Sequence, residues 1–175
     1  MSEDAKIPVS KSPFWRFSVK FYAVPGVAPA CIELQDQAGV DVNVLFFLLW
    51  NATQRRTFSR EQVADIERKI GAWRDMAVVP LRAVRRALRS APPVIAPEVA
   101  EGFRTRIKAV ELEAERLQQE ALYGIAQAGP PGEPAASPDD AARRSVAAYE
   151  ATLRPFPEAS LEAILGAFSR FNPAD

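Results

Sequence analysis

The sequence contains no histidine among its 175 residues, which removes a whole group of mechanisms. Ser-His-Asp and Cys-His catalysis, histidine-ligated metals and histidine pH switches all need an imidazole ring. Cysteine is nearly as scarce: Cys31 is the single one, so there is no internal disulfide and no CxxC zinc or redox motif. We expect Cys31 to be a buried packing residue. The sequence therefore predicts no catalytic residue, no metal and no cofactor.

A net charge and a long apolar run are also missing. Lys plus Arg and Asp plus Glu number 22 each, which excludes a globally basic nucleic-acid coat protein and a polyanionic mimic. The strongest apolar run, 42–50, is far shorter than the roughly 20 residues that span a bilayer. Residues 1–11 lack the apolar stretch of a signal peptide. These features predict a cytoplasmic protein without a membrane partner.

Apolar residues do recur at helical spacing along nearly the whole chain. We predict an all-α fold, an irregular bundle of seven or eight helices with no strand. Residues 42–52 are apolar nearly all round, which predicts a buried central helix. Ser59 and Gln62 form a capping-box pattern that begins a helix, and Pro80 is expected to interrupt it. Further helices are expected over about 27–37, 80–89 and 97–127.

Proline and glycine mark the domain organisation. Residues 129–138 contain four prolines and two glycines, which is typical of a loop or flexible linker. We expect an N-terminal tail over 1–12, a helical core domain over 13–128, and a C-terminal helical pair over 139–175 that packs on the core.

The expected helix over 97–127 carries an apolar stripe with heptad-like spacing. Its members alternate steps of four and three residues: Phe103, Ile107, Val110, Ala114, Leu117 and Ala121. The stripe lasts about two and a half heptads, fewer than the three or four that indicate a coiled coil. Two interpretations stay open, a long helix lying across the bundle or a helix that forms a dimer.

The N-terminal half carries a distinctive pattern. It combines an FW-x-FS start at Phe14, a Tyr-x-x-x-Gly-Val turn, Cys31, then LQD, Gly, DVN and a closing Leu-Trp at Trp50. The segment VPLRAVRRALR at 79–89 extends the pattern. Together they resemble an uncharacterised proteobacterial family of conserved hypothetical proteins, a helical domain of unknown function. The resemblance implies a small helical bacterial protein and assigns no catalytic residue.

Basic side chains concentrate in residues 50–90, where ten basic and four acidic residues give a local charge of +6. The most compact group is an arginine face: Arg82, Arg85, Arg86 and Arg89. Three interpretations are open. The face could pair with the acidic helix around 111–120 of the same chain, dock a protein partner, or bind nucleic-acid phosphates. No aromatic residue interleaves with these arginines, which weakens the case for a single-strand stacking site.

A second polar group brackets the glycine at position 39 and consists of Gln35, Asp36, Asp41 and Asn43. Its carboxylate and amide oxygens could bind a hard cation such as Mg²⁺, although the spacing is not that of an EF-hand. The structural interpretation, which we favour, is that Asp41 caps the helix after it while Asn43 hydrogen-bonds a loop backbone.

These observations favour a non-enzymatic protein-interaction or regulatory factor whose protein partner contacts the arginine face. A nucleic-acid-associated accessory factor using the same arginines is the alternative. A divalent-metal-dependent enzyme using Asp36 and Asp41 ranks last.

Overall fold

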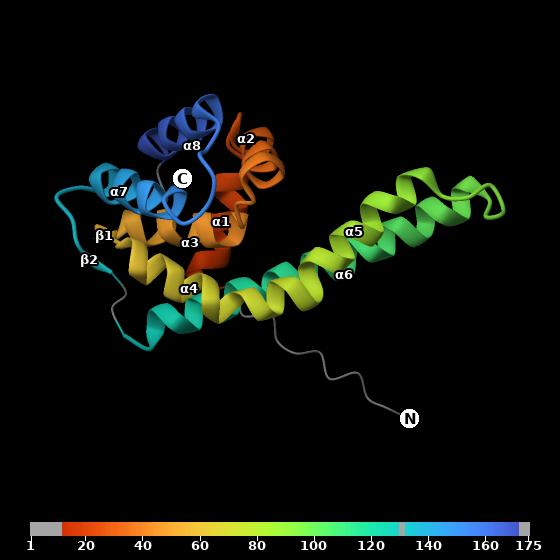
Figure 1. Cartoon of the computed structure of the whole chain (residues 1–175), viewed down its shortest axis with the longest axis horizontal. Helices are drawn as coiled ribbons and strands as arrows, with labels where there is room; N and C mark the ends of the chain where they lie inside the picture. Colours follow the sequence, from red (N-terminus) through yellow and green to blue (C-terminus); the bar gives the residue numbers. More distant parts are fainter. Residues whose placement is uncertain (1–11, 130–131, 172–175) are drawn as a thin grey trace.

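The computed structural model describes residues 12–129 and 132–171, and these are helical almost throughout (Figure 1). The all-α prediction is confirmed. The α-helices are α1 (Pro13–Tyr22), α2 (Val27–Glu33), α3 (Val42–Thr53), α4 (Arg60–Trp73), α5 (Val79–Ala87), α6 (Pro97–Gln127), α7 (Pro138–Glu150) and α8 (Glu158–Arg170). Two π-helical turns, η1 (Leu34–Ala38) and η2 (Arg74–Val78), follow α2 and α4, and a 3-10 turn, η3 (Leu88–Ser90), follows α5. The N-terminal tail expected over 1–12 lies outside the described residues, except for Ser12.

Helix α3 lies at the centre of the core, as its apolar composition predicts. Val44, Leu45 and Phe47 are completely buried, and α7 makes the most extensive contact with this helix. Asp41 caps it, because the Oδ1 atom accepts hydrogen bonds from the amides of Asn43 and Val44 at 2.9 and 3.4 Å. The all-round burial and the cap thus follow directly from the sequence.

Helices α7 and α8 share this core. Val146 and Tyr149 of α7 and Ile164 and Phe168 of α8 are buried in the same apolar cluster as α1 and α3. The last two helices therefore complete the core around α3, as Figure 1 shows.

Two residues of the proline-rich segment form a short strand, β2 (Glu133–Pro134), which pairs antiparallel with β1 (Arg56–Thr57). The amide of Ala135 also donates to the carbonyl of Arg55 at 2.8 Å. This two-stranded pair corrects the prediction of no strand. Strands of two residues are too short to show the alternation that identifies a strand in a sequence.

The helix that begins at the capping box does not break before Pro80. Instead α4 continues through η2 into α5, and the amide of Val79 donates to the carbonyl of Arg74, five residues earlier. Proline has no N–H and would clash with the carbonyl four residues before it in an α-helix. The wider π turn lies at this position and lets the chain stay helical.

Helix α5 and the first half of α6 project from the body as an antiparallel hairpin, residues 79–112, which we call the arm (Figure 1). Helix α5 packs chiefly on α6, and none of its residues is fully buried. The second half of α6 returns to the body and contacts α1, α3 and α4. No helix in the described ranges, α6 included, combines the length and apolarity needed to cross a bilayer.

Candidate functional site

Two members of the arginine face turn inward within the arm. Arg82 lies 3.2 Å from Glu111 and 2.7 Å from Glu115, measured from Nε and Nη2 to the Oε1 atoms. Arg85 also pairs with Glu111, through both Nε and Nη2. Glu111 is only 4% exposed, so the two guanidinium groups neutralise a buried carboxylate. Arg82 and Arg85 thus hold α5 against the acidic helix of their own chain.

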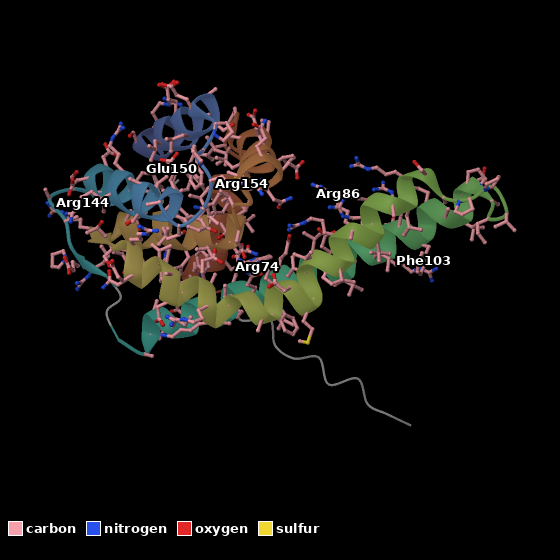
Figure 2. The ribbon with its side chains drawn as sticks, in the orientation of Figure 1. Arg74, Arg86, Phe103, Arg144, Glu150 and Arg154 are labelled. Carbon is pink, nitrogen blue, oxygen red and sulfur yellow. The ribbon has the colours of Figure 1, made fainter. Side chains whose placement is uncertain are left out.

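The other two arginines are exposed. Arg86 Nη2 lies 2.9 Å from Asp36 Oδ1, a partly exposed pair that links the arm to η1 of the body. The hydrogen bond from Arg86 lowers the pKa of Asp36, and one from Gln35 adds to it. Arg89 has no ion pair with any residue that the structure describes. Figure 2 shows Arg86 on the side of the arm that faces α2, with Phe103 on the opposite edge.

Asp41 and Asn43 lie where α6 crosses the beginning of α3. The Oδ2 atom of Asp41 accepts a hydrogen bond from Gln118 Nε2 at 2.6 Å. The Oδ1 atom of Asn43 accepts one from Gln119 Nε2 at 2.8 Å, in place of the loop backbone predicted for it. Burial raises the pKa of the Asp41 carboxyl, although the Gln118 hydrogen bond acts in the opposite direction.

Three further residues, Glu67, Arg74 and Tyr149, complete this polar network at the foot of the arm. The Tyr149 hydroxyl accepts from the Asp41 amide at 2.9 Å and donates to Glu67 Oε1 at 2.6 Å. Arg74 Nη1 lies 2.5 Å from Glu67 Oε2 and 3.4 Å from Asp41 Oδ2. Figure 2 places Arg74 where the arm leaves the body. The network therefore fixes the junction of α3, α4, α6 and α7.

Sequence reasoning missed these partners of Asp41. One signal was available: Gln118 lies four residues after Ala114 and four before Leu122, both of which are buried. A polar residue in the middle of a buried helical face needs a polar partner elsewhere in the fold.

Asp36 and Asp41 have separate partners. Asp36 is exposed on η1 and bound by Arg86, whereas both carboxylate oxygens of Asp41 already accept hydrogen bonds in the core. Within the described ranges, no group of three or more cysteine, aspartate or glutamate side chains could hold a metal ion. The geometry thus gives the proposed Mg²⁺ site no support.

Helix α6 buries several polar side chains and exposes several large apolar ones. Glu111, Gln118 and Gln119 face the protein and are at most 6% exposed. On another side of the same helix lie Val99, Phe103, Val110 and Leu117, which are 63, 44, 52 and 43% exposed. We call these four residues the open stripe; their spacing of four, seven and seven residues keeps them on one side of the helix. Exposed apolar side chains aligned on one side of a helix make this side of α6 a candidate binding surface.

The heptad-like stripe is therefore divided in the fold. Ala114 is buried and Ile107 half-buried against the chain's own residues, whereas Phe103, Val110 and Leu117 are exposed. The arm region as a whole is rich in exposed apolar side chains. Those between positions 76 and 117 are Met76, Val79, Val84, Val94, Ile95, Val99, Phe103, Val110, Leu112 and Leu117.

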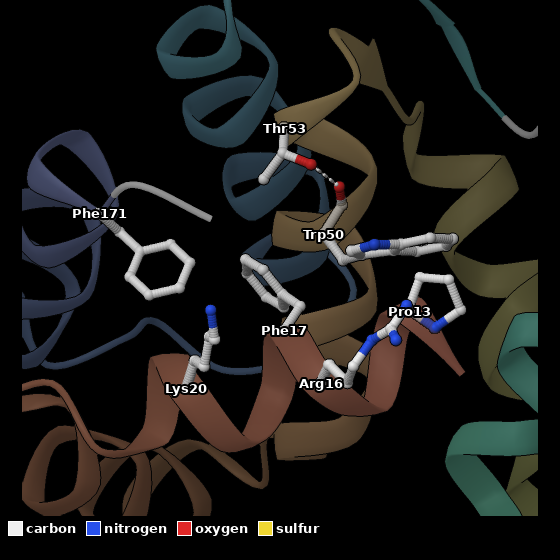
Figure 3. A pocket seen from close by; sticks show the side chains of 7 residues that line it. All are labelled: Pro13, Arg16, Phe17, Lys20, Trp50, Thr53 and Phe171. Carbon is white, nitrogen blue, oxygen red and sulfur yellow. Dashed lines mark hydrogen bonds between the residues drawn. The ribbon is translucent and has the colours of Figure 1, made fainter. Parts of the chain in front are cut away.

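A hollow of about 260 Å³ opens beside α1 (Figure 3). It is lined by Pro13, Arg16, Phe17, Lys20, Trp50, Thr53 and Phe171. No carboxylate or thiol is among these residues, and the Thr53 hydroxyl already donates to the Trp50 carbonyl at 2.6 Å. The hollow is also smaller than the roughly 300–1,000 Å³ of ordinary ligand pockets. It offers no catalytic constellation.

The prediction that Cys31 is a buried packing residue is confirmed. Cys31 is 1% exposed, and burial raises the pKa of its thiol to about 12. A thiol in this state is a packing residue and a poor nucleophile.

A family model described as "Protein of unknown function (DUF2390)" matches residues 13–122. The chain belongs to this family. The DUF2390 match covers α1 to α5 and most of α6, so it includes the whole arm, and it ends before α7. It agrees with the resemblance of the N-terminal half to a helical family of unknown function. No curated protein and no solved structure shows a significant match to the chain.

Proposed function

We propose that this DUF2390 protein is a non-enzymatic protein-binding factor, and that α6 carries the contact surface. The open stripe is the observation that supports the proposal. Burying a large apolar side chain stabilises a protein by about 1.5–3 kcal/mol, and the monomer forgoes much of this gain at Phe103, Val110 and Leu117. A partner that covers these side chains would recover it.

The arginine face has a smaller part in this proposal than the sequence suggests. Arg82 and Arg85 are engaged by Glu111, so binding through them would have to break a buried ion pair. Arg86 is exposed but pairs with Asp36 on the edge of the arm opposite Phe103, so it does not border the open stripe. The same ion pairs weigh against phosphate binding, which would use the arginines as free cations.

The proposal places the protein in the cytoplasm. Its single cysteine is buried and unpaired, which suits a reducing compartment.

A pair of variants tests the surface. Val110 and Leu112 are 52 and 50% exposed, and they lie two residues apart, which places them on nearly opposite sides of α6. Tagged wild type, Val110→Glu and Leu112→Glu would each be used to capture proteins from native lysate at low salt. We expect wild type and Leu112→Glu to retain the same proteins and Val110→Glu to lose them.

Two outcomes would contradict the proposal. One is retention unaffected by Val110→Glu. The other is recovery that disappears after nuclease treatment and on Arg86→Glu with Arg89→Glu, which would identify nucleic acid as the ligand. Circular dichroism melts of all variants show whether folding is intact.

A further inference from the structure

We propose that the partner of the open stripe is a second copy of this chain, bound antiparallel so that α6 of one copy packs along α6 of the other. This inference rests on the proposed function, because it names the partner of the same surface.

The open stripe matches itself in one antiparallel register. In this register the Val110 residues of the two copies face each other on a two-fold axis. Phe103, seven residues before Val110, then lies opposite Leu117 of the second copy, seven residues after it. Val99 then lies opposite the exposed Ala121, eleven residues to either side. Large apolar side chains thus face each other in the middle of the contact, and at each end Val99 faces the smaller Ala121. A two-fold interface needs this kind of self-complementary patch.

The charges beside the stripe match in the same register. Arg106 and Glu113 lie seven residues apart on one edge of α6, four residues before and three after Val110. A two-fold axis perpendicular to the helices brings the same edge of both copies together. Each Arg106 then lies near Glu113 of the second copy, which also pairs with Arg116 of its own chain. Arg106 rests over the Phe103 ring, 5.6 Å from its centroid, and forms no ion pair with a described residue. Opposite charges along such an edge set the orientation of paired helices.

The arm also lacks a core of its own. None of the residues of α5 is fully buried, and the polar side of α6 is already satisfied by Arg82, Arg85 and the network around Asp41. Helices in proteins gain most of their stability from packing an apolar face. An antiparallel contact between α6 of two copies supplies that packing for the open stripe. The strip from 99 to 121 is about 33 Å long, so the contact extends along most of α6, from the arm into the half that returns to the body.

Disulfide trapping tests the contact at its centre. A Val110→Cys variant would be oxidised mildly, with Leu112→Cys as the matched control and the wild type as the control for Cys31, which is 1% exposed. We expect Val110→Cys to form a covalent dimer on a non-reducing gel, and Leu112→Cys and wild type to stay monomeric. Equal cross-linking of both variants, or none of Val110→Cys, would overturn the proposal.

The register is tested by mixing two variants. Phe103→Cys and Leu117→Cys should cross-link with each other and not with themselves, because like positions are about 21 Å apart in the antiparallel pair. A parallel pair gives the reverse result and would overturn the register.

Sedimentation equilibrium separates this proposal from the one on which it rests. We expect the wild type to be a dimer and Val110→Glu to be a folded monomer. A wild type that is monomeric at every concentration, while Val110→Glu still loses its captured proteins, refutes self-association and leaves the protein-binding function standing. If Val110→Glu changes neither the mass nor the capture, both proposals fail.

Discussion

The hydroxyl of Tyr149 accepts a hydrogen bond from the backbone amide of Asp41, 2.9 Å away and 108 residues earlier in the chain. The same hydroxyl donates to Glu67. Tyr149 belongs to α7, outside the region that the DUF2390 model matches, whereas Asp41 caps the central helix inside it. A residue from the C-terminal part of the chain thus accepts a hydrogen bond from a buried amide of the region that the family model matches.

Replacing Tyr149 by phenylalanine tests this dependence. Tyr149→Phe leaves the buried Asp41 amide without its acceptor, and we expect the free energy of unfolding to fall by about 1–3 kcal/mol. Tyr22→Phe is the control, since Tyr22 is 43% exposed, and its effect should stay within about 0.5 kcal/mol. Urea denaturation measures both. Equal losses in the two variants would show that the hydroxyl of Tyr149 is dispensable.

The pH dependence of stability reports the burial of Asp41. Because burial raises its pKa in the folded state, the folded protein holds the proton more tightly than the unfolded chain. The contribution of Asp41 is therefore greatest below the ordinary aspartate pKa and decreases as the pH rises towards the raised folded pKa.

Asp41→Asn removes this titration and leaves the other carboxyl groups in place. We expect the stability difference between wild type and Asp41→Asn to be larger near about pH 4 than near about pH 7. Thermal melts of both proteins across this range measure it. A difference that increases with pH would mean that Arg74 and Gln118 outweigh the burial.

The ion pairs of Arg82 and Arg85 both depend on the Glu111 carboxylate. Glu111→Gln removes the charge that Arg82 and Arg85 share, and we expect a loss of about 2–3 kcal/mol. Glu113→Gln is the matched control: Glu113 pairs with Arg116 on the surface, and its side chain is 56% exposed. Such surface ion pairs contribute little to the free energy of unfolding. Guanidinium denaturation of both variants decides whether the Glu111 cluster holds the arm together.

Two glycines should respond oppositely to alanine. Gly132 has φ +74°, and a Cβ there would lie 2.4 Å from the Thr57 carbonyl oxygen, so Gly132→Ala should destabilise the β1–β2 contact by more than about 1 kcal/mol. Gly124 lies within α6 with open space around it, so Gly124→Ala should stabilise the protein by up to about 1 kcal/mol. Melting temperatures that move in the same direction would contradict this assignment.

The features that the sequence predicts correctly are those determined by residues close together in the chain. The all-round apolar character of α3, its Asp41 cap and the capping box at Ser59 are local patterns, and the structure has all three. The long-range partners of Asp41 lie 33 to 108 residues away in sequence, so no local pattern could assign them to Asp41. In α6, periodicity identifies an apolar side but not what covers it, so the exposure of Phe103 and Val110 needed the fold.

The π turn η2 also determines how the two halves of one helical rod are rotated relative to each other. An α-helix advances by about 100° per residue, so deleting a single residue from 74–78 would turn α5 by that angle about its own axis. Arg82 and Arg85 would then point away from Glu111, although every side chain of the arm would be unchanged. The pairing of α5 with α6 therefore depends on the number of residues between α4 and Pro80.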